Sequence, residues 1–167
     1  MIDDSTRAGF RIRTAKPSDL SAVDRLLGRS YPKLLKADYA PSTLVLALPG
    51  MIKARPSLLS SRTYYVAEGR DGQLYGAGGW TRSRRPGRGD VRHVVTDPDV
   101  LRQGIGRALM QHSFAVARGY GLSELECWAT RTAVPFYEAL DFRVLGPMEV
   151  TLGNGAVFPA VRMEKLL

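Results

Sequence analysis

Two glycines, Gly104 and Gly106, stand between a predicted strand and a predicted amphipathic helix. Because glycine has no Cβ, the backbone can turn sharply there and a ligand can approach the amide groups closely. Amides at the start of a helix lack intrahelical acceptors, and the helix dipole adds positive potential. With Arg102 and Arg107 beside it, this Gly-x-Gly loop predicts a cradle for a phosphate or pyrophosphate group.

The spacing around the loop excludes two common phosphate-binding motifs. A Walker loop needs Gly-Lys-Ser/Thr at a fixed distance from its first glycine, and the chain has none there. A dinucleotide fingerprint needs a third glycine, but Leu109 occupies that position. A lone Gly-x-Gly also suits an ordinary helix-entry loop, so the surrounding sequence has to separate the two interpretations.

That surrounding sequence resembles the acyl-CoA-binding segment of the GNAT superfamily of N-acetyltransferases. In the family, a strand ending in an apolar-apolar-x-x-Pro pattern leads into an Arg/Gln-x-x-Gly-x-Gly/Ala loop. Here the strand ends Val94-Val95-Thr96-Asp97-Pro98 and the loop reads Leu101-Arg102-Gln103-Gly104-Ile105-Gly106. Leu101 stands where the family has Arg or Gln, so we expect backbone amides, which do not depend on side-chain identity, to bind the pyrophosphate.

A second motif lies farther along the chain, between Ala133 and Phe142. It reads Ala-Val-Pro-Phe-Tyr-Glu-Ala-Leu-Asp-Phe and is similar to the family's pattern of a small residue, Phe-Tyr and Gly-Phe. Asp141 replaces the family's glycine, and Asp tolerates the left-handed backbone geometry that ends many helices. The two motifs occur in the family's order, and the resemblance extends from Phe10 to the C-terminus.

The resemblance implies acetyl transfer from acetyl-CoA to an amine, by direct attack in a ternary complex. Backbone groups of Val94, Val95 and Thr96 would hold the pantetheine arm and polarise the thioester carbonyl. Tyr137 matches the tyrosine that protonates the departing thiolate, a role that suits a phenol with a pKa of about 10. The implied pyrophosphate site comprises Arg102, Gln103, Gly104, Ile105, Gly106 and Arg107.

The acceptor is left open, because residues 30–61 contain no motif that specifies one. We expect the primary amine of a small molecule. A protein lysine or N-terminus is the alternative acceptor. A non-catalytic acyl-CoA-binding regulatory module and a basic nucleic-acid-binding protein are the alternatives from other classes.

No motif fixes the group that accepts the proton of the acceptor's ammonium. Asp90 and His93 lie on the predicted strand that carries the carbonyl-polarising amides, and strand alternation predicts that they point to opposite faces. Neighbouring arginines should lower the pKa of Asp90, whereas a histidine ordinarily titrates near neutrality. The sequence therefore favours His93 slightly, and leaves Glu68 and a water relay open.

Five other side chains have two interpretations each. Cys127 could carry an acetyl group as a nucleophile, but its place in an apolar strand favours a buried thiol. The aromatic residues Trp80, Trp128, Tyr31 and Tyr39 suit the core as well as the wall of an acceptor pocket.

Apolar periodicity and turn residues predict the elements that position this chemistry. Strands are expected at 10–14, 63–68, 74–81, 90–96, 125–129, 143–152 and 157–165. Helices are expected after Pro17, with Ser18 as the cap, and at 104–118 and 133–140. Prolines at four positions predict that residues 30–61 break into short helices. The result is an α/β fold of the GNAT type, with a mixed, mostly antiparallel sheet flanked by helices.

The length of 167 residues predicts one domain, residues 1–167. The net charge is +8, and part of it lies in the arginines between Arg82 and Arg92. We favour a solvated loop for that segment, ahead of long-range attraction of a polyanionic cofactor. Nucleic-acid binding is disfavoured, because no recognition motif accompanies the basic patch.

Composition also limits location and cofactors. One cysteine rules out an internal disulfide, and no Cys/His cluster predicts a metal. No apolar run approaches the length of a membrane helix, and the acidic segment 1–5 lacks a signal-peptide pattern. We therefore expect a cytoplasmic enzyme without metal, and the sequence is compatible with a homodimer.

Overall fold

The computed structural model describes residues 9–167, so the predicted start of the domain and the segment 1–5 lie outside the described residues. Its sheet has seven strands in the order β1-β2-β3-β4-β5-β7-β6. Every neighbouring pair is antiparallel except β4 and β5, which are parallel. The strands are β1 (Phe10–Thr14), β2 (Tyr64–Gly69), β3 (Leu74–Arg82), β4 (Arg88–Thr96), β5 (Glu124–Ala129), β6 (Arg143–Thr151) and β7 (Val157–Leu166).

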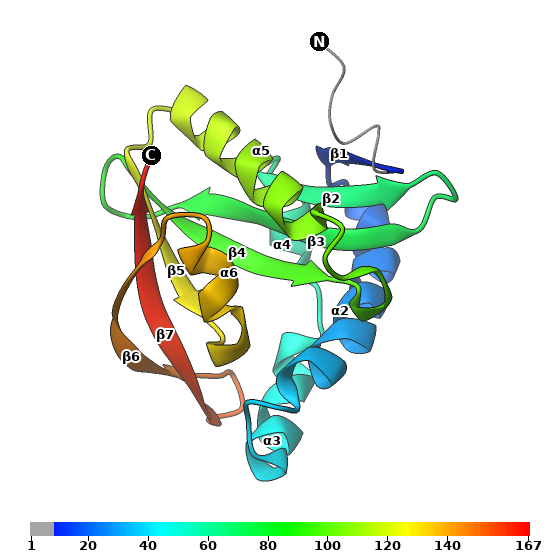
Figure 1. Ribbon diagram of the computed structural model, residues 1–167, viewed down its shortest axis with the longest axis vertical. Helices are drawn as coiled ribbons and strands as arrows, with labels where there is room; N and C mark the ends of the chain where they lie inside the picture. Colours follow the sequence, from blue (N-terminus) through cyan, green and yellow to red (C-terminus); the bar gives the residue numbers. More distant parts are fainter. Residues whose placement is uncertain (1–8) are drawn as a thin grey trace.

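Helices cover both faces of the sheet. In Figure 1, α5 crosses one face over β2, β3 and β4, and α2 lies against the other face. The short helix α6 lies on the α5 side, near β5. The helices are α2 (Leu20–Leu35), α3 (Pro41–Met51), α4 (Pro56–Leu59), α5 (Ile105–Gly119) and α6 (Val134–Glu138); three turns are 3-10 helices, η1 (Pro17–Asp19), η2 (Pro98–Val100) and η3 (Arg131–Ala133).

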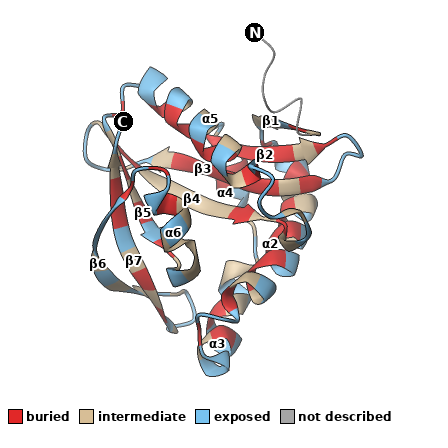
Figure 2. Ribbon diagram, in the orientation of Figure 1, coloured by how far each residue is buried: buried red, intermediate tan, exposed pale blue. Residues whose placement is uncertain are grey.

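Two apolar clusters separate along the central strands because successive side chains point to opposite faces. Tyr65 and Ala67 of β2 belong to the cluster under α5, whereas Tyr64 and Val66 belong to the cluster under α2. In Figure 2, β2 and β3 are buried along most of their length, β4 is mostly intermediate, and the edge strand β6 is mostly exposed. The double burial of β2 and β3 makes them a firm platform beside β4, which carries the site residues.

The helical region 30–61 differs from the prediction at two prolines. The breaks expected at Pro32 and Pro49 are wrong, because α2 continues through Pro32 to Leu35 and α3 continues through Pro49 to Met51. A proline inside a helix removes one hydrogen bond and costs about 3 kcal/mol. The fully buried side chains of Leu26 and Leu35, on either side of Pro32, offset that cost. At the other end, the N-cap position of α2 is Asp19 rather than Ser18, and its side chain makes no capping bond to α2. Its carboxylate accepts the Lys16 N–H at 2.8 Å instead, which closes the preceding turn η1.

The arginines between β3 and β4 are not all in a solvated loop. Arg88 begins β4 and is buried, with ion pairs to Glu124 at 2.8 Å and Glu164 at 3.1 Å. It therefore joins β4 to β5 and β7 at the end of the sheet where β4 and β5 pair. Within residues 9–167, no helix combines the length and apolarity that a bilayer span requires.

Candidate functional site

A cleft opens where β4 and β5 stop pairing. Their parallel ladder covers three pairs, from Arg88 with Glu124 to Asp90 with Glu126, and beyond Asp90 the two strands diverge (Figure 1). β5 continues to pair with β7 on its other edge. A cavity of about 440 Å³ lies in the gap, lined by β4, β5, α6, the end of α3 and the β6–β7 turn. That volume is in the range of small-molecule sites.

A β-bulge in β4 shapes one wall of the cleft. Between two register pairs with β3, β4 contains His93 and Val94 where β3 contains only Gly78. His93 has a φ of +41°, which lies in the left-handed region. A Cβ on residue 78 would lie 3.0 Å from the Val94 side chain, so glycine makes room for the extra residue. The Tyr64 hydroxyl donates a hydrogen bond of 2.8 Å to the His93 carbonyl and holds the bulge in place.

The bulge makes the predicted alternation of β4 wrong. Val91 and Val94 both pack against the cluster under α5, whereas Val95 belongs to the cluster under α2. His93 lines a small cavity on the α2 side, and Asp90, which precedes Val91 in the strand, points to that side too. Asp90 and His93 therefore share one face of the sheet, and both line the main cleft.

Burial changes the expected basicity of both candidate bases. The pKa of His93 falls to about 4, first because the ring is buried and then because the Arg55 and Arg92 guanidiniums lie nearby. The pKa of Asp90 is raised, mainly by burial and also by the Glu126 carboxylate, although Arg92 at 3.5 Å opposes the shift. The predicted lowering of the Asp90 pKa is therefore wrong, because desolvation outweighs the nearby arginine.

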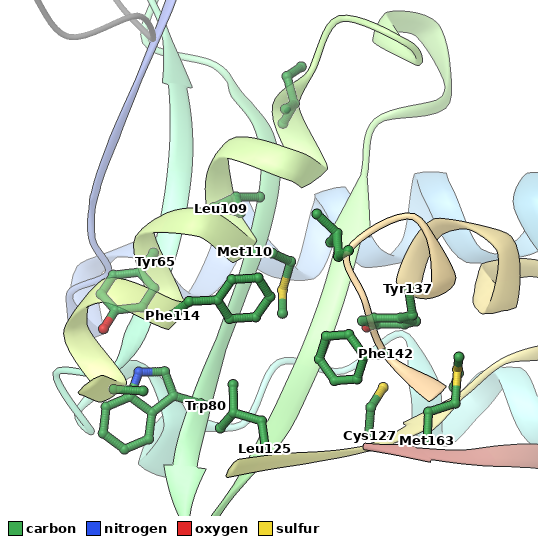
Figure 3. Packing of buried hydrophobic residues seen from close by; sticks show 14 of the residues in the cluster. Tyr65, Trp80, Leu109, Met110, Phe114, Leu125, Cys127, Tyr137, Phe142 and Met163 are labelled. Atoms are coloured by element: carbon green, nitrogen blue, oxygen red, sulfur yellow. The ribbon is translucent and has the colours of Figure 1, made fainter. Parts of the chain in front are cut away.

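Tyr137 projects from α6 into the wall of the cleft beside Cys127 of β5 (Figure 3). The pKa of its hydroxyl lies well above 10, raised mainly by burial and also by the neighbouring Cys127. Burial also raises the pKa of the Cys127 thiol to about 12. At neutral pH both groups keep their protons, so Tyr137 can act as an acid and Cys127 is a poor nucleophile.

The Gly-x-Gly loop presents unpaired amides at the start of α5. Gly104 caps the helix with a φ of +79°, and its carbonyl accepts the Ala108 N–H at 2.9 Å. The N–H groups of residues 105–107 precede this first helical bond and so have no acceptor within the helix. Residues 101–104 are exposed. A Cβ on Gly106 would lie 3.0 Å from the Phe136 ring, so this glycine lets α6 lie close to the loop.

Asp97 anchors the same loop, and no sequence motif indicated this. It is 5% exposed and pairs with Arg29 of α2 at 2.6 Å. Its carboxylate accepts the Asp99 N–H at 2.9 Å, and its own N–H donates to the Tyr75 carbonyl at 2.8 Å. These contacts fix the path of the chain between the bulged strand and the exposed amides.

The other sequence candidates separate into two groups. Tyr31 and Trp128 line the cleft, whereas Trp80 and Tyr39 are buried in the core. Glu68, the third candidate base, does not line the cleft and is ion-paired with β1 arginines. Within residues 9–167 no cluster of three or more metal-binding side chains was found.

Glu126 and Arg55 also line the cleft and were missed by sequence reasoning. Neither belongs to a motif, and Arg55 comes from the proline-rich region whose path the sequence did not specify. Only their convergence with Asp90 in space identifies them.

The family model of the acetyltransferase (GNAT) domain matches residues 49–167, which include the bulged strand, the Gly-x-Gly loop and Tyr137. The chain belongs to the GNAT acetyltransferase family. It is therefore an acyl-CoA-dependent acetyltransferase, and the fold predicted from its motifs is confirmed. No curated protein matches the sequence significantly.

Solved GNAT structures share the fold at low sequence identity. A GCN5-related N-acetyltransferase from Rhodopseudomonas palustris has a TM-score of 0.77 and 18% identity, over 95% of this chain and 96% of that one. The PaiA N-acetyltransferase of Thermoplasma acidophilum, in complex with coenzyme A, has a TM-score of 0.69 and 15% identity, over 95% and 99%. The ribosomal-protein-S18-alanine N-acetyltransferase of Escherichia coli has a TM-score of 0.66 and 17% identity, over 94% and 93%.

In this GNAT protein, His93 should titrate far below the ordinary pKa of a histidine. Its ring should stay neutral until the pH falls to about 4, because burial and two guanidiniums oppose its positive charge. The unfolded chain binds that proton near its ordinary pKa of about 6.5. Folding stability should therefore fall as the pH drops through this window.

Ring-proton NMR shifts of the two histidines, assigned with His93→Gln, measure the His93 titration. His93→Gln should also remove this part of the loss of stability at acid pH. A midpoint near 6.5 would contradict the buried environment of the ring.

Proposed function

We propose that the protein transfers an acetyl group from acetyl-CoA to the primary amine of a small molecule, by direct attack in a ternary complex. The observation that carries the proposal is the convergence of Tyr137, Asp90 and the β4 bulge on one cleft, beside a helix start with free amides. Good alignment of reactants can supply about 7–11 kcal/mol of the barrier reduction.

The binding of acetyl-CoA is assigned to backbone groups. The N–H groups of the loop, comprising Arg102, Gln103, Gly104, Ile105, Gly106 and Arg107, would hold the pyrophosphate at the start of α5. Backbone groups of Val94, Val95 and Thr96 would hold the pantetheine arm, since this part of β4 has no ladder with β5. At the bulge, the same backbone stretch would also donate the hydrogen bond that polarises the thioester carbonyl.

Proton movements are assigned to two side chains that face the cleft. Asp90 would accept a proton from the ammonium of the acceptor, directly or through water, so that the neutral amine can attack the thioester; burial raises the pKa of Asp90 above that of an ordinary carboxylate. Tyr137 would give its hydroxyl proton to the departing thiolate as the carbon–sulfur bond breaks. His93 is the second candidate for the base, with a pKa of about 4 that makes it weakly basic. The protonated Cys127 thiol supports direct transfer rather than an acetyl-cysteine intermediate.

The size of the cleft supports a small acceptor, because its volume of about 440 Å³ is in the range of small-molecule sites. The end of α3 and the β6–β7 turn contribute to its lining. The fold is shared with an enzyme named for the ribosomal-protein-S18 alanine terminus, so a protein N-terminus is the second candidate and a protein lysine the third. We further propose that residues 1–167 work as one acyltransferase domain in the cytoplasm.

A loop variant tests the cofactor site. Gly104→Val should abolish the rise in melting temperature that acetyl-CoA causes, because the side chain covers the amides and strains the left-handed turn. Gly121→Val is the matched control: Gly121 has a φ of +83° and equally open surroundings, at the far end of α5. It should cost similar stability and keep the acetyl-CoA shift. An unchanged shift in Gly104→Val would place the pyrophosphate elsewhere.

Removing one hydroxyl tests the general acid. Tyr137→Phe should lower kcat by about 10²- to 10⁴-fold with little change in acetyl-CoA affinity, because only the proton donor is lost. Tyr65→Phe serves as control, since Tyr65 is equally buried in the cluster under α5 but does not line the cleft. Thioester cleavage with a competent amine is the measurement. Equal rates for Tyr137→Phe and wild type would remove the tyrosine from the mechanism.

The base is tested by comparing two neighbours on one face of β4. Asp90→Asn should lower kcat/KM by about 10²- to 10⁴-fold, and His93→Gln should have a smaller effect because its pKa is already low. The pH profile of kcat/KM distinguishes them, run with an amine of lowered pKa beside an ordinary one. If both variants keep the wild-type profile, neither residue is the base, and Glu126 or a water relay takes its place.

A further inference from the structure

We propose that the acceptor carries a carboxylate as well as its amine, with an apolar body between them, and that Arg55 binds the carboxylate. An amino acid with an apolar side chain has this chemistry. The inference rests on the proposed function, because it concerns the acceptor end of the same cleft.

The charges in the cleft leave one cation without a partner. Four charged side chains line it, two carboxylates and two guanidiniums. Asp90 pairs with Arg92 at 3.5 Å, and Glu126 pairs with Arg162 from β7. Arg55 forms no ion pair with any carboxylate of residues 9–167. An anionic group on the acceptor would give the Arg55 guanidinium an ion-pair partner.

The position of Arg55 is fixed by its backbone. Its carbonyl accepts the N–H groups of Leu58 and Leu59 at 3.0 and 3.3 Å, at the start of α4. The preceding residue, Ala54, donates its N–H to Asp24 of α2 at 2.6 Å. The side chain leaves this anchored segment toward the cleft and lies near enough to His93 to lower the pKa of that ring. Arg55 is therefore placed next to the reactive wall of the cleft.

The two ends of the cleft differ in charge. At the sheet, Asp90 and Glu126 face each other across the last rung of the β4–β5 ladder, where the amine must approach. At the helical wall, Arg55 presents a planar guanidinium. A guanidinium binds a carboxylate with better geometry than a lysine ammonium does. An acceptor with an amine at one end and a carboxylate at the other matches this polarity. A second ammonium, as in a diamine, would meet Arg55 with like charge.

Apolar side chains that line the cleft would contact the apolar body of the acceptor. Trp128 is 57% exposed and lines the cleft, although a tryptophan on a strand is usually covered. Met51 and Leu152 line the same cleft from α3 and the β6–β7 turn. Small-molecule sites combine such apolar walls with a few polar groups that fix orientation.

The experiment uses three amines that differ in one group: leucine, leucinamide and isoamylamine. Rates are expressed per neutral amine, because the three amines titrate differently. Wild type should acetylate leucine with a kcat/KM about 10-fold or more above leucinamide, the scale of one charge-assisted hydrogen bond. Arg55→Gln should abolish this preference, so that leucine and leucinamide react with similar kcat/KM. Arg55→Glu should reverse the preference toward leucinamide.

A nearby exposed cation supplies the control. Lys53→Gln removes one positive charge two residues away, from a side chain that does not line the cleft, and should keep the preference for leucine. The KM for acetyl-CoA should be the same in all variants.

Failure of the inference differs from failure of the proposed function. If wild type acetylates isoamylamine or a peptide N-terminus but not leucine, or if Arg55→Gln keeps the leucine preference, the inference is overturned. Absence of acetyl-CoA binding in wild type would overturn the proposed function itself.

Discussion

The site depends on one feature of the sheet, the loss of pairing between β4 and β5 after Asp90. A parallel ladder normally continues as long as both strands do, so something must separate these two. Buried Arg88 holds them together at one end through Glu124 and Glu164. The bulge at His93 then turns β4 away, because an extra residue bends the strand that carries it and increases its twist. The cleft is the space between β5 and the part of β4 that the bulge turns away.

A second set of contacts keeps the cleft open to a defined width. Tyr39, between α2 and α3, stacks on Phe158 of β7 at 4.5 Å, and its hydroxyl donates to the Pro159 carbonyl at 2.8 Å. The same hydroxyl accepts the Arg131 N–H at 2.8 Å, just beyond β5. One aromatic side chain thus connects the helical layer to both strands on the far side of the cleft. Arg55 belongs to the helical layer and Trp128 belongs to β5, so the connection joins the two walls of the cleft that carry them.

Burial decides the chemistry of the cleft more than the residue types do. Histidine ordinarily titrates near neutrality and aspartate well below it, which favoured His93 as the base. In the folded protein the buried ring loses basicity and the buried carboxylate gains it, so the two pKa values move toward each other. Tyr137 and Cys127 follow the same rule, since both keep their protons because the charged forms would be desolvated.

The sequence by itself determined the family, the order of strands and helices, the Gly-x-Gly loop and the left-handed geometry of Asp141, because local spacing and backbone preference encode these features. Only the tertiary structure decided which side chains share the cleft. Strand alternation placed Asp90 and His93 on opposite faces, and a bulge that depends on Gly78 of another strand put them on one. Asp90 and Arg55, which line the same cleft, come from segments distant in sequence. Such pairs depend on packing and register, which no local pattern records.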